Sequence, residues 1–152
     1  MTSKTPQGGV TSREELSKVL AESAFARIYN FTLHSFASGE CTLIVPFDES
    51  LERPGGIVAG SVLMTAADVA MWLAIMTRLG TDAMSVTTEM ATTFLNSARR
   101  EDVRCTARVL KLGKSLIYGV AECSTDGGKR LTHHMITYVR LENNPAGLLK
   151  RA

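Results

Sequence analysis

The sequence predicts an α+β fold in which a curved antiparallel sheet wraps one long apolar helix, with an extra helix near the N-terminus. The residues from near Gly60 to Leu79 are apolar on all sides, which is typical of a buried helix. Strand patterns stand before and after this helix in the chain, and tight turns join those that follow it. A helix buried all round needs a sheet curved around it, because a flat sheet would leave its other side in water.

Length and composition predict one globular domain over residues 1–152. The chain has 152 residues, of which 45% are hydrophobic, and this is enough to form a real core. The formal net charge is only +2, and no block of Arg and Lys interleaves with aromatic residues. A nucleic-acid-binding protein is therefore not expected.

The first helix is predicted over Arg13–Arg27. Ser12 followed by Glu15 is a capping-box pattern, and apolar residues then recur at helical spacing as far as Ala24. The polar stretch Met1–Val10 lacks the apolar segment of a signal peptide.

Two short strands and a loop are predicted between the two helices. The strands are Phe31–Phe36 and Glu40–Phe47, and Ser38-Gly39 forms the turn between them. The loop covers Glu49–Gly56 and contains Pro54-Gly55-Gly56. Gly80 then ends the long helix.

The rest of the chain predicts strands and two tight turns. The turns are Gly113-Lys114 and Asp126-Gly127-Gly128, so the last three strands should form an antiparallel meander. From Asn143 the tail is predicted to be loose or a short terminal turn. The four strands are Val86–Leu95, Val103–Leu112, Leu116–Cys123 and Leu131–Arg140.

Asp68 is the only charged residue between Ile57 and Thr77. A lone carboxylate in a buried helix must find a partner, become neutral or serve a functional site. The run is about long enough to span a bilayer, but it is rich in Ala, Thr and Gly and carries Asp68 near its centre. We therefore expect a core helix and no membrane span.

Other kinds of site find no support in the sequence. Cys41, Cys105 and Cys123 make no zinc spacing, and free thiols in a reducing cytoplasm are the simplest account. The neighbours His133 and His134 face opposite sides of one strand and cannot chelate one metal together, so no metal site is expected.

Four stretches, in this order, resemble the hotdog-fold acyl-CoA thioesterases, and more narrowly their PaaI-like (phenylacetate-pathway type) branch. They cover roughly Phe31 to Arg140, so the resemblance implies that the core of the domain lies at about 31–140. The resemblance implies a hotdog fold and the hydrolysis of an acyl-CoA thioester, with coenzyme A as part of the substrate and no separate cofactor. The stretches are Arg53-Pro-Gly-Gly-Ile-Val-Ala-Gly-Ser-Val-Leu-Met-Thr-Ala-Ala-Asp68, Val86-Thr-Thr-Glu-Met-Ala-Thr-Thr-Phe-Leu95, Ala107-Arg-Val-Leu-Lys-Leu-Gly-Lys114 and His133 to Tyr138.

The resemblance also implies three catalytic residues. In the family an acid on the central helix attacks the thioester or activates water, and Asp68 matches it. A glycine at the start of that helix donates its backbone N–H to the thioester carbonyl, and Gly60 matches it. A Ser or Thr early in the following strand holds the water or the acid. Thr87 is the better match, with Thr88 as its neighbour.

The predicted substrate-binding residues are Arg53, Ala59, Ser61, Thr88 and Lys114. The sequence departs from the family pattern at two places among them. The family's helix usually opens with His-Gly-Gly and here reads Ala59-Gly60-Ser61, and a polar Asn or Gln six positions before that His is replaced by Arg53. The loss of the His leaves the Gly60 N–H and the acid in place.

Turn cations provide a further, weaker indication. Arg99, Arg100 and Lys114 lie in predicted turns, where they could meet the phosphates of coenzyme A. Ordinary solvated turn charge is the more common role for any one of them.

The chemistry predicts a dimer if both Gly60 and Asp68 act. The two residues are eight positions apart on one helix, which is about 12 Å at ~1.5 Å per residue. A carbonyl-binding N–H and a carboxylate must both lie ~3 Å from one thioester. Gly60 of one subunit must therefore meet Asp68 of another, in a dimer or a dimer of dimers. Desolvation should raise the pKa of Asp68 and nearby donors should lower it, and the sequence leaves that balance open.

The sequence also leaves open purely structural roles for these residues and other functions for the protein. Asp68 could be a structural acid satisfied by Thr65, Thr87 or a backbone N–H, and Gly60 could simply permit helix entry. A hotdog protein could bind acyl-CoA without hydrolysing it. A hotdog dehydratase or hydratase would need a His near Asp68, and a transcriptional regulator would need a helix-turn-helix.

Overall fold

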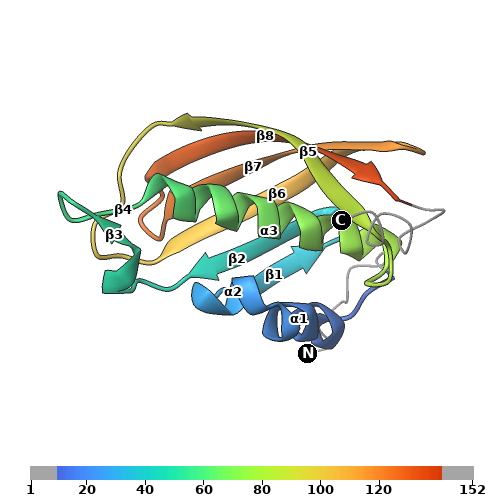
Figure 1. Cartoon of the computed structure of the whole chain (residues 1–152), viewed down its shortest axis with the longest axis horizontal. Helices are drawn as coiled ribbons and strands as arrows, with labels where there is room; N and C mark the ends of the chain where they lie inside the picture. Colours follow the sequence, from blue (N-terminus) through green and yellow to red (C-terminus); the bar gives the residue numbers. More distant parts are fainter. Residues whose placement is uncertain (1–9, 142–152) are drawn as a thin grey trace, which may run out of the picture.

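The computed structural model describes residues 10–141 and consists of a six-stranded antiparallel sheet packed against a long central helix (Figure 1). In chain order the elements are α1 (Arg13–Glu22), α2 (Ala24–Ile28), β1 (Thr32–Ala37), β2 (Glu40–Val45), a 3₁₀ turn η1 (Glu49–Leu51), β3 (Glu52–Arg53), β4 (Ile57–Val58), α3 (Gly60–Leu79), β5 (Ser85–Phe94), β6 (Val103–Leu112), β7 (Leu116–Thr125) and β8 (Arg130–Arg140). This is the predicted hotdog architecture.

The sheet runs in the order β1-β2-β6-β7-β8-β5. β6, β7 and β8 form the predicted meander, and each pairs with the next in antiparallel register. β5 precedes them in the chain but pairs with β8, so it forms one edge of the sheet while β1 forms the other. The strand that follows the central helix is therefore left with one unpaired side in this chain.

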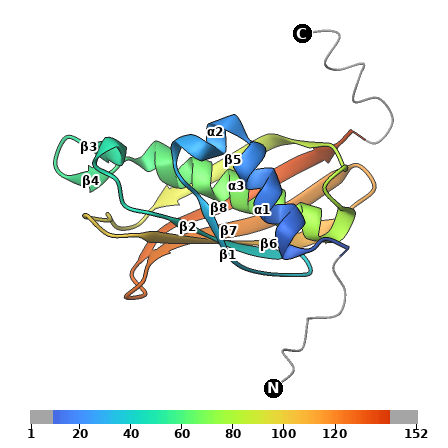
Figure 2. The same ribbon diagram turned by 90° about the horizontal axis from the view of Figure 1, so that it is seen from below.

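All three helices lie on the same face of the sheet (Figure 2). α3 packs on β2, β6 and β7 and carries a large share of the hydrophobic core, including Leu63, Met71, Leu73 and Ile75. Its length and mean hydropathy of 1.5 would suit a membrane span, but 67% of that apolar window is buried inside the domain. As expected, α3 is a core helix.

One stripe of α3 is not covered by its own sheet. Ser61 and Met64 are exposed, while Thr65, Asp68 and Trp72 are only half-buried. These positions recur every three or four residues, so they line one side of the helix. The prediction of a helix buried all round is therefore wrong for the single chain, because the sheet wraps only part of its circumference.

The N-terminal helix differs from its prediction. Instead of one helix over Arg13–Arg27, the chain forms α1 and α2 with a break at Ser23. Ser23 has an extended backbone, and both its hydroxyl and its N–H donate to the Val19 carbonyl, which ends α1. The predicted capping box of Ser12 and Glu15 is present. The break turns α2 toward α3, where Phe25 meets Trp72 with ring centroids 6.4 Å apart.

The predicted loop Glu49–Gly56 contains more structure than expected. It holds η1, which Asp48 caps by accepting a hydrogen bond from the Ser50 N–H, and the small β3–β4 hairpin. Gly55 and Gly56 have φ of +104° and +69°, which only glycine adopts readily, so they provide the hairpin turn. The remaining strands lie within a few residues of their predicted bounds, and β6 matches them. The tail from Asn143 and the residues before Val10 lie outside the described residues.

Candidate active site

Asp68 lies midway along α3, with its side chain between the helix and the β5–β8 edge of the sheet. The Thr87 hydroxyl, from β5, donates a hydrogen bond of 2.7 Å to Oδ1. The Tyr138 hydroxyl, from β8, donates to the same Oδ1 at 2.7 Å and also lies 2.9 Å from the Asp68 backbone carbonyl. Oδ2 of Asp68 has no hydrogen-bond partner within residues 10–141. One carboxylate oxygen is therefore held, and the other is free to meet a ligand.

Tyr138 was not among the residues singled out from the sequence. Along β8 the inward positions alternate as Thr132, His134, Ile136 and Tyr138, and all four are buried. The available signal was this period of two, which ends on an aromatic residue with a polar tip. Burial, and then the charge of Asp68, raises the pKa of Tyr138 well above its ordinary value, so the hydroxyl remains a donor.

A cavity of about 240 Å³ opens beside Asp68. Most of its wall is apolar and is contributed by Phe25 of α2, Val69 and Trp72 of α3, and Val86 of β5. Asp68, Thr87 and Tyr138 also line it, together with Ser85. The cavity thus combines an apolar wall with a hydrogen-bonded carboxylate, which is the usual composition of a small-molecule site.

Thr87 and Thr88 take different roles, as the strand alternation predicts. A β-bulge interrupts the pairing of β5 with β8 between Thr87 and Glu89, so Thr88 has no direct partner residue. The Thr88 hydroxyl donates 3.2 Å to the Thr137 carbonyl and does not reach Asp68. Of the two threonines, only Thr87 touches the acid.

Gly60 is the first residue of α3, and its N–H is directed out of the helix end. The residue before it, Ala59, caps the helix with no side-chain hydrogen bond. In the described part of the chain the Gly60 N–H has no acceptor, because the first helical N–H that reaches one belongs to Val62, which donates to Ala59. Unpaired N–H groups at a helix N-terminus carry a partial positive charge.

Gly60 lines a second cavity, of about 370 Å³, at the N-terminal end of α3. Arg53 from the β3–β4 hairpin and Phe94 from the end of β5 share this cavity, together with Asn96 and Ser97. Ala59 is half-buried beside it, and Ser61 is exposed on the uncovered stripe of the helix. The predicted substrate-binding residues Arg53, Ala59 and Ser61 therefore gather around Gly60 and not around Asp68.

The Gly60 cavity and the Asp68 cavity share no lining residue. They open at different points along the same helix, about 12 Å apart by the rise of ~1.5 Å per residue. Within one chain, the N–H of Gly60 and the carboxylate of Asp68 cannot contact one thioester group.

Of the turn cations, Arg99 and Arg100 contact the β3–β4 hairpin, whereas Lys114 lies apart from them. Lys114 is exposed in the β6–β7 turn, next to Gly113, whose carbonyl accepts a 3.1 Å hydrogen bond from Arg140. Arg99 donates 2.9 Å to the Gly55 carbonyl, and Arg100 lies 3.5 Å from Glu52. Lys114 lines neither cavity.

The histidines and cysteines occupy structural positions. His134 is fully buried, with Nδ1 2.9 Å from Thr92 and Nε2 2.7 Å from Thr132, while His133 faces the opposite side of β8 and contacts Glu122. Cys41, Cys105 and Cys123 are buried free thiols. Residues 10–141 contain no group of three His, Cys, Asp or Glu side chains arranged to hold a metal ion.

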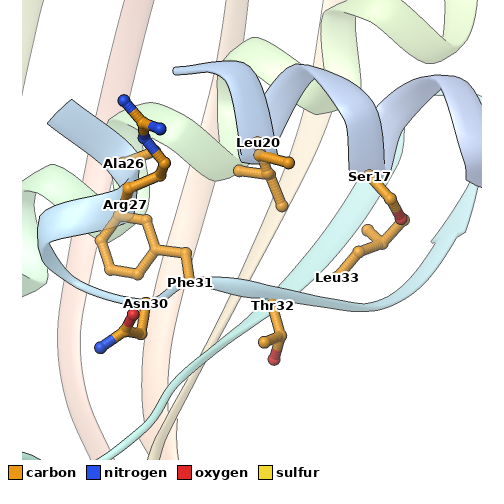
Figure 3. A pocket seen from close by; sticks show the side chains of 9 residues that line it. Ser17, Leu20, Ala26, Arg27, Asn30, Phe31, Thr32 and Leu33 are labelled. Carbon is orange, nitrogen blue, oxygen red and sulfur yellow. The ribbon is translucent and has the colours of Figure 1, made fainter. Parts of the chain in front are cut away.

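A third cavity, larger than these two at about 450 Å³, lies elsewhere, between the N-terminal helices and β1 (Figure 3). Leu20 and Ala26 face Phe31 and Leu33 across it, and Arg27 stands at its rim. None of the residues predicted for catalysis or substrate binding lines it. Size alone therefore does not identify the site suggested by the chemistry of Asp68.

The chain matches proteins of known family. Residues 55–132 match the Thioesterase superfamily. A protein of Thermoplasma volcanium that is provisionally named an esterase is 30% identical over 104 residues, which are 68% of this chain and 77% of that protein.

Two solved structures illustrate the likeness in three dimensions. A protein of Silicibacter sp. TM1040, provisionally named a thioesterase, is 29% identical with a TM-score of 0.79, covering 91% of this chain and 99% of that one. Zebrafish thioesterase superfamily member 2 is 26% identical with a TM-score of 0.74, covering 84% of this chain and 94% of that one. This chain belongs to the thioesterase superfamily of hotdog-fold hydrolases.

Proposed function

We propose that this protein hydrolyses acyl-coenzyme A thioesters to the free acid and coenzyme A, as a PaaI-like member of its superfamily. The observation that carries the proposal is the carboxylate of Asp68, which is held through Oδ1 on the wall of a mostly apolar cavity. An acyl group can occupy such a cavity while its carbonyl carbon stands beside the free Oδ2. Membership of the superfamily supports a hydrolase in general.

Asp68 serves as nucleophile or as general base in this reaction. As a base it takes a proton from water, whose oxygen then bonds to the carbonyl carbon. The C–S bond breaks, and coenzyme A leaves as a thiolate that takes up a proton. As a nucleophile Asp68 forms an anhydride that water then opens. A single turnover in ¹⁸O-labelled water distinguishes the routes, because only the nucleophile route places ¹⁸O in the Asp68 carboxylate.

The Gly60 N–H supplies the second element of the proposed site. Thioester hydrolysis develops negative charge on the carbonyl oxygen, and a preorganised N–H at a helix N-terminus stabilises that charge. The N–H of Gly60 is unpaired in the described structure. Because Gly60 has no Cβ, no side chain of this residue obstructs the approach of a substrate to the N–H. Arg53, Ser61, Thr88 and Lys114 would bind the remainder of the substrate, and the reaction as proposed needs no further cofactor.

The proposed unit is a homodimer in which Gly60 of one subunit meets Asp68 of the other. Two surfaces of this chain suit such a partner: the uncovered stripe of α3 that includes Asp68, and the unpaired edge of β5 that includes Thr87. A twofold axis would bring the Gly60 cavity of each chain to the Asp68 cavity of its partner and form two equivalent sites. We extend this to a dimer of dimers, since Leu116 and Met135 are exposed elsewhere on the sheet.

We place the protein in the cytoplasm. Its three cysteines are buried as free thiols, although Cys105 of β6 and Cys123 of β7 stand opposite each other in the sheet. Unlinked cysteines in such positions suit a reducing compartment.

The test is free-thiol release from a panel of short, long and aromatic acyl-CoAs, comparing the wild type with Asp68→Asn. Asparagine keeps the size of the side chain and its acceptor oxygen but cannot act as base or nucleophile. We expect turnover of at least one member by the wild type and a loss of roughly a hundredfold or more in the variant, with its thermal unfolding unchanged. Turnover that survives the substitution would reject Asp68 as the catalytic acid.

The rival function is a protein that binds acyl-CoA without hydrolysing it. Ala59 stands where the family usually has a His that shapes the carbonyl pocket, and Arg53 replaces an Asn or Gln. This rival predicts acyl-CoA binding by calorimetry with no thiol release from any member of the panel.

A further inference from the structure

The hydroxyl of Tyr138 is the second donor to Asp68, and it comes from a different strand than the first. Tyr138 is only 3% exposed, and its ring is packed in the core beneath α3. Its oxygen lies 2.7 Å from Oδ1 and 2.9 Å from the backbone carbonyl of Asp68. A phenol has one proton to donate, and a carboxylate is the stronger acceptor, so the proton is directed mainly to Oδ1.

Two donors on one oxygen restrict how the carboxylate can turn. Thr87 approaches Oδ1 from β5 and Tyr138 approaches it from β8, so rotation about the last side-chain bond of Asp68 would break both hydrogen bonds. The Thr87 hydroxyl alone could not fix the group, because Thr87 is exposed at the edge of the sheet. The rigid anchor is the buried tyrosine.

We propose that Tyr138 is a positioning residue that holds Asp68 with Oδ2 toward the substrate. This inference rests on the proposed thioesterase function. A hydrogen bond to the charged form of an acid favours that form, so its loss makes the acid easier to protonate. Tyr138 therefore acts through Asp68 and need not touch the thioester.

The variant that tests the proposal is Tyr138→Phe, with Tyr118→Phe as the matched control. Both remove one phenolic oxygen from the same sheet, but Tyr118 is 37% exposed and lines neither cavity at α3. For Tyr138→Phe we expect kcat to fall roughly ten- to a hundredfold, the range for a hydrogen bond to a charged group, with KM nearly unchanged. The acid limb of the pH profile of kcat should move to higher pH. Tyr118→Phe should leave kcat and the profile at wild-type values.

A merely structural tyrosine would give a different result. If Tyr138→Phe lowers kcat while the acid limb stays in place, or leaves kcat unchanged, the proposal is overturned. In an Asp68→Asn background the substitution should cost nothing further in turnover, and an additional loss of the same size would also overturn it.

Two further measurements keep the proposal testable when the simple variant or the assay fails. If Tyr138→Phe does not fold, 3-fluorotyrosine placed at position 138 keeps the ring and provides a stronger donor, and the acid limb should move to lower pH. If the wild type hydrolyses no acyl-CoA, the ¹³C signal of the Asp68 carboxyl can be titrated in the wild type and Tyr138→Phe. A midpoint that does not rise in the variant contradicts the positioning role, independently of the proposed function.

Discussion

A Cβ atom on Gly60 would stand 2.8 Å from Cε1 and 3.1 Å from Cζ of Phe94. The first residue of α3 and the last residue of β5 are thus in close contact at the N-terminal end of the helix. Phe94 is 54% exposed, so its ring has room to move. The absence of a side chain at position 60 allows this ring to pack against the helix end.

This contact provides a matched pair of variants, Gly60→Ala and Gly60→Pro. Both add the Cβ that meets Phe94, but only proline removes the N–H. Proline suits this position because it is the first in the helix and Ala59 before it is extended, with ψ of 138°. We expect Gly60→Pro to lower kcat roughly a hundredfold, and Gly60→Ala only several-fold. Thiol release measures both, and equal losses in the two variants would remove the N–H from the mechanism.

Thr87→Val and Thr87→Ser test the other donor to Asp68. Valine keeps the branched shape but loses the hydroxyl, whereas serine keeps the hydroxyl. A lost hydrogen bond to a carboxylate corresponds to roughly a tenfold or greater fall in kcat for Thr87→Val. Thr87→Ser should stay within a few-fold of the wild type. Thr93→Val is the control, since Thr93 lies on the same strand but lines neither cavity at α3, and a fall as large as that of Thr87→Val would refute the assignment.

Phe25→Ala tests whether α2 limits the acyl group. Phe25 contacts Trp72 and forms part of the wall of the Asp68 cavity, so its truncation should lengthen that cavity. We expect the ratio of kcat/KM for longer over shorter acyl-CoAs to rise roughly tenfold, because a methylene or two in an apolar pocket is worth about that factor. Ile28→Ala, on the same helix but outside the cavities at α3, should leave the ratio unchanged. An unaltered ratio in Phe25→Ala would place the acyl group elsewhere.

Much of the fold could be predicted because its signals are local. The run of apolar residues identified α3 from Gly60 to Leu79, and the period of two identified β6 over Val103–Leu112. The break at Ser23 could not be predicted, because the helical pattern continues through it and the break depends on hydrogen bonds to the Val19 carbonyl. This missed break brings Phe25 into the cavity beside Asp68.

The candidate site was predicted only in part, because some of its residues give local signals in the sequence and others do not. Asp68 was evident as a lone charge in an apolar helix, and Gly60 as a helix start. Tyr138 could not be connected with Asp68, since the two are seventy positions apart and meet only because β8 packs against α3. Which face of β8 meets α3 depends on this long-range packing.

The buried thiol of Cys41 predicts loss of stability at alkaline pH. Burial raises its pKa from 9.0 to about 12. The unfolded chain therefore releases this proton first, and the free energy of unfolding falls as pH rises between these values, by up to about 1.4 kcal/mol per pH unit. Cys41→Ala should remove this part of the slope. Urea unfolding at pH 8, 10 and 11 checks it, and parallel pH dependences in the two proteins would contradict the assignment.

The most direct measurement of the central claim is thiol release by a mixed dimer of one Asp68→Asn subunit and one Gly60→Pro subunit, co-expressed with different tags and purified through both. A site built from two chains leaves one complete pair, Asp68 of the proline subunit with Gly60 of the asparagine subunit. The account predicts about half of the wild-type activity per dimer, while each parent variant has almost none. A mixed dimer as inactive as its parents would contradict a shared site and would indicate that each active site lies within one subunit.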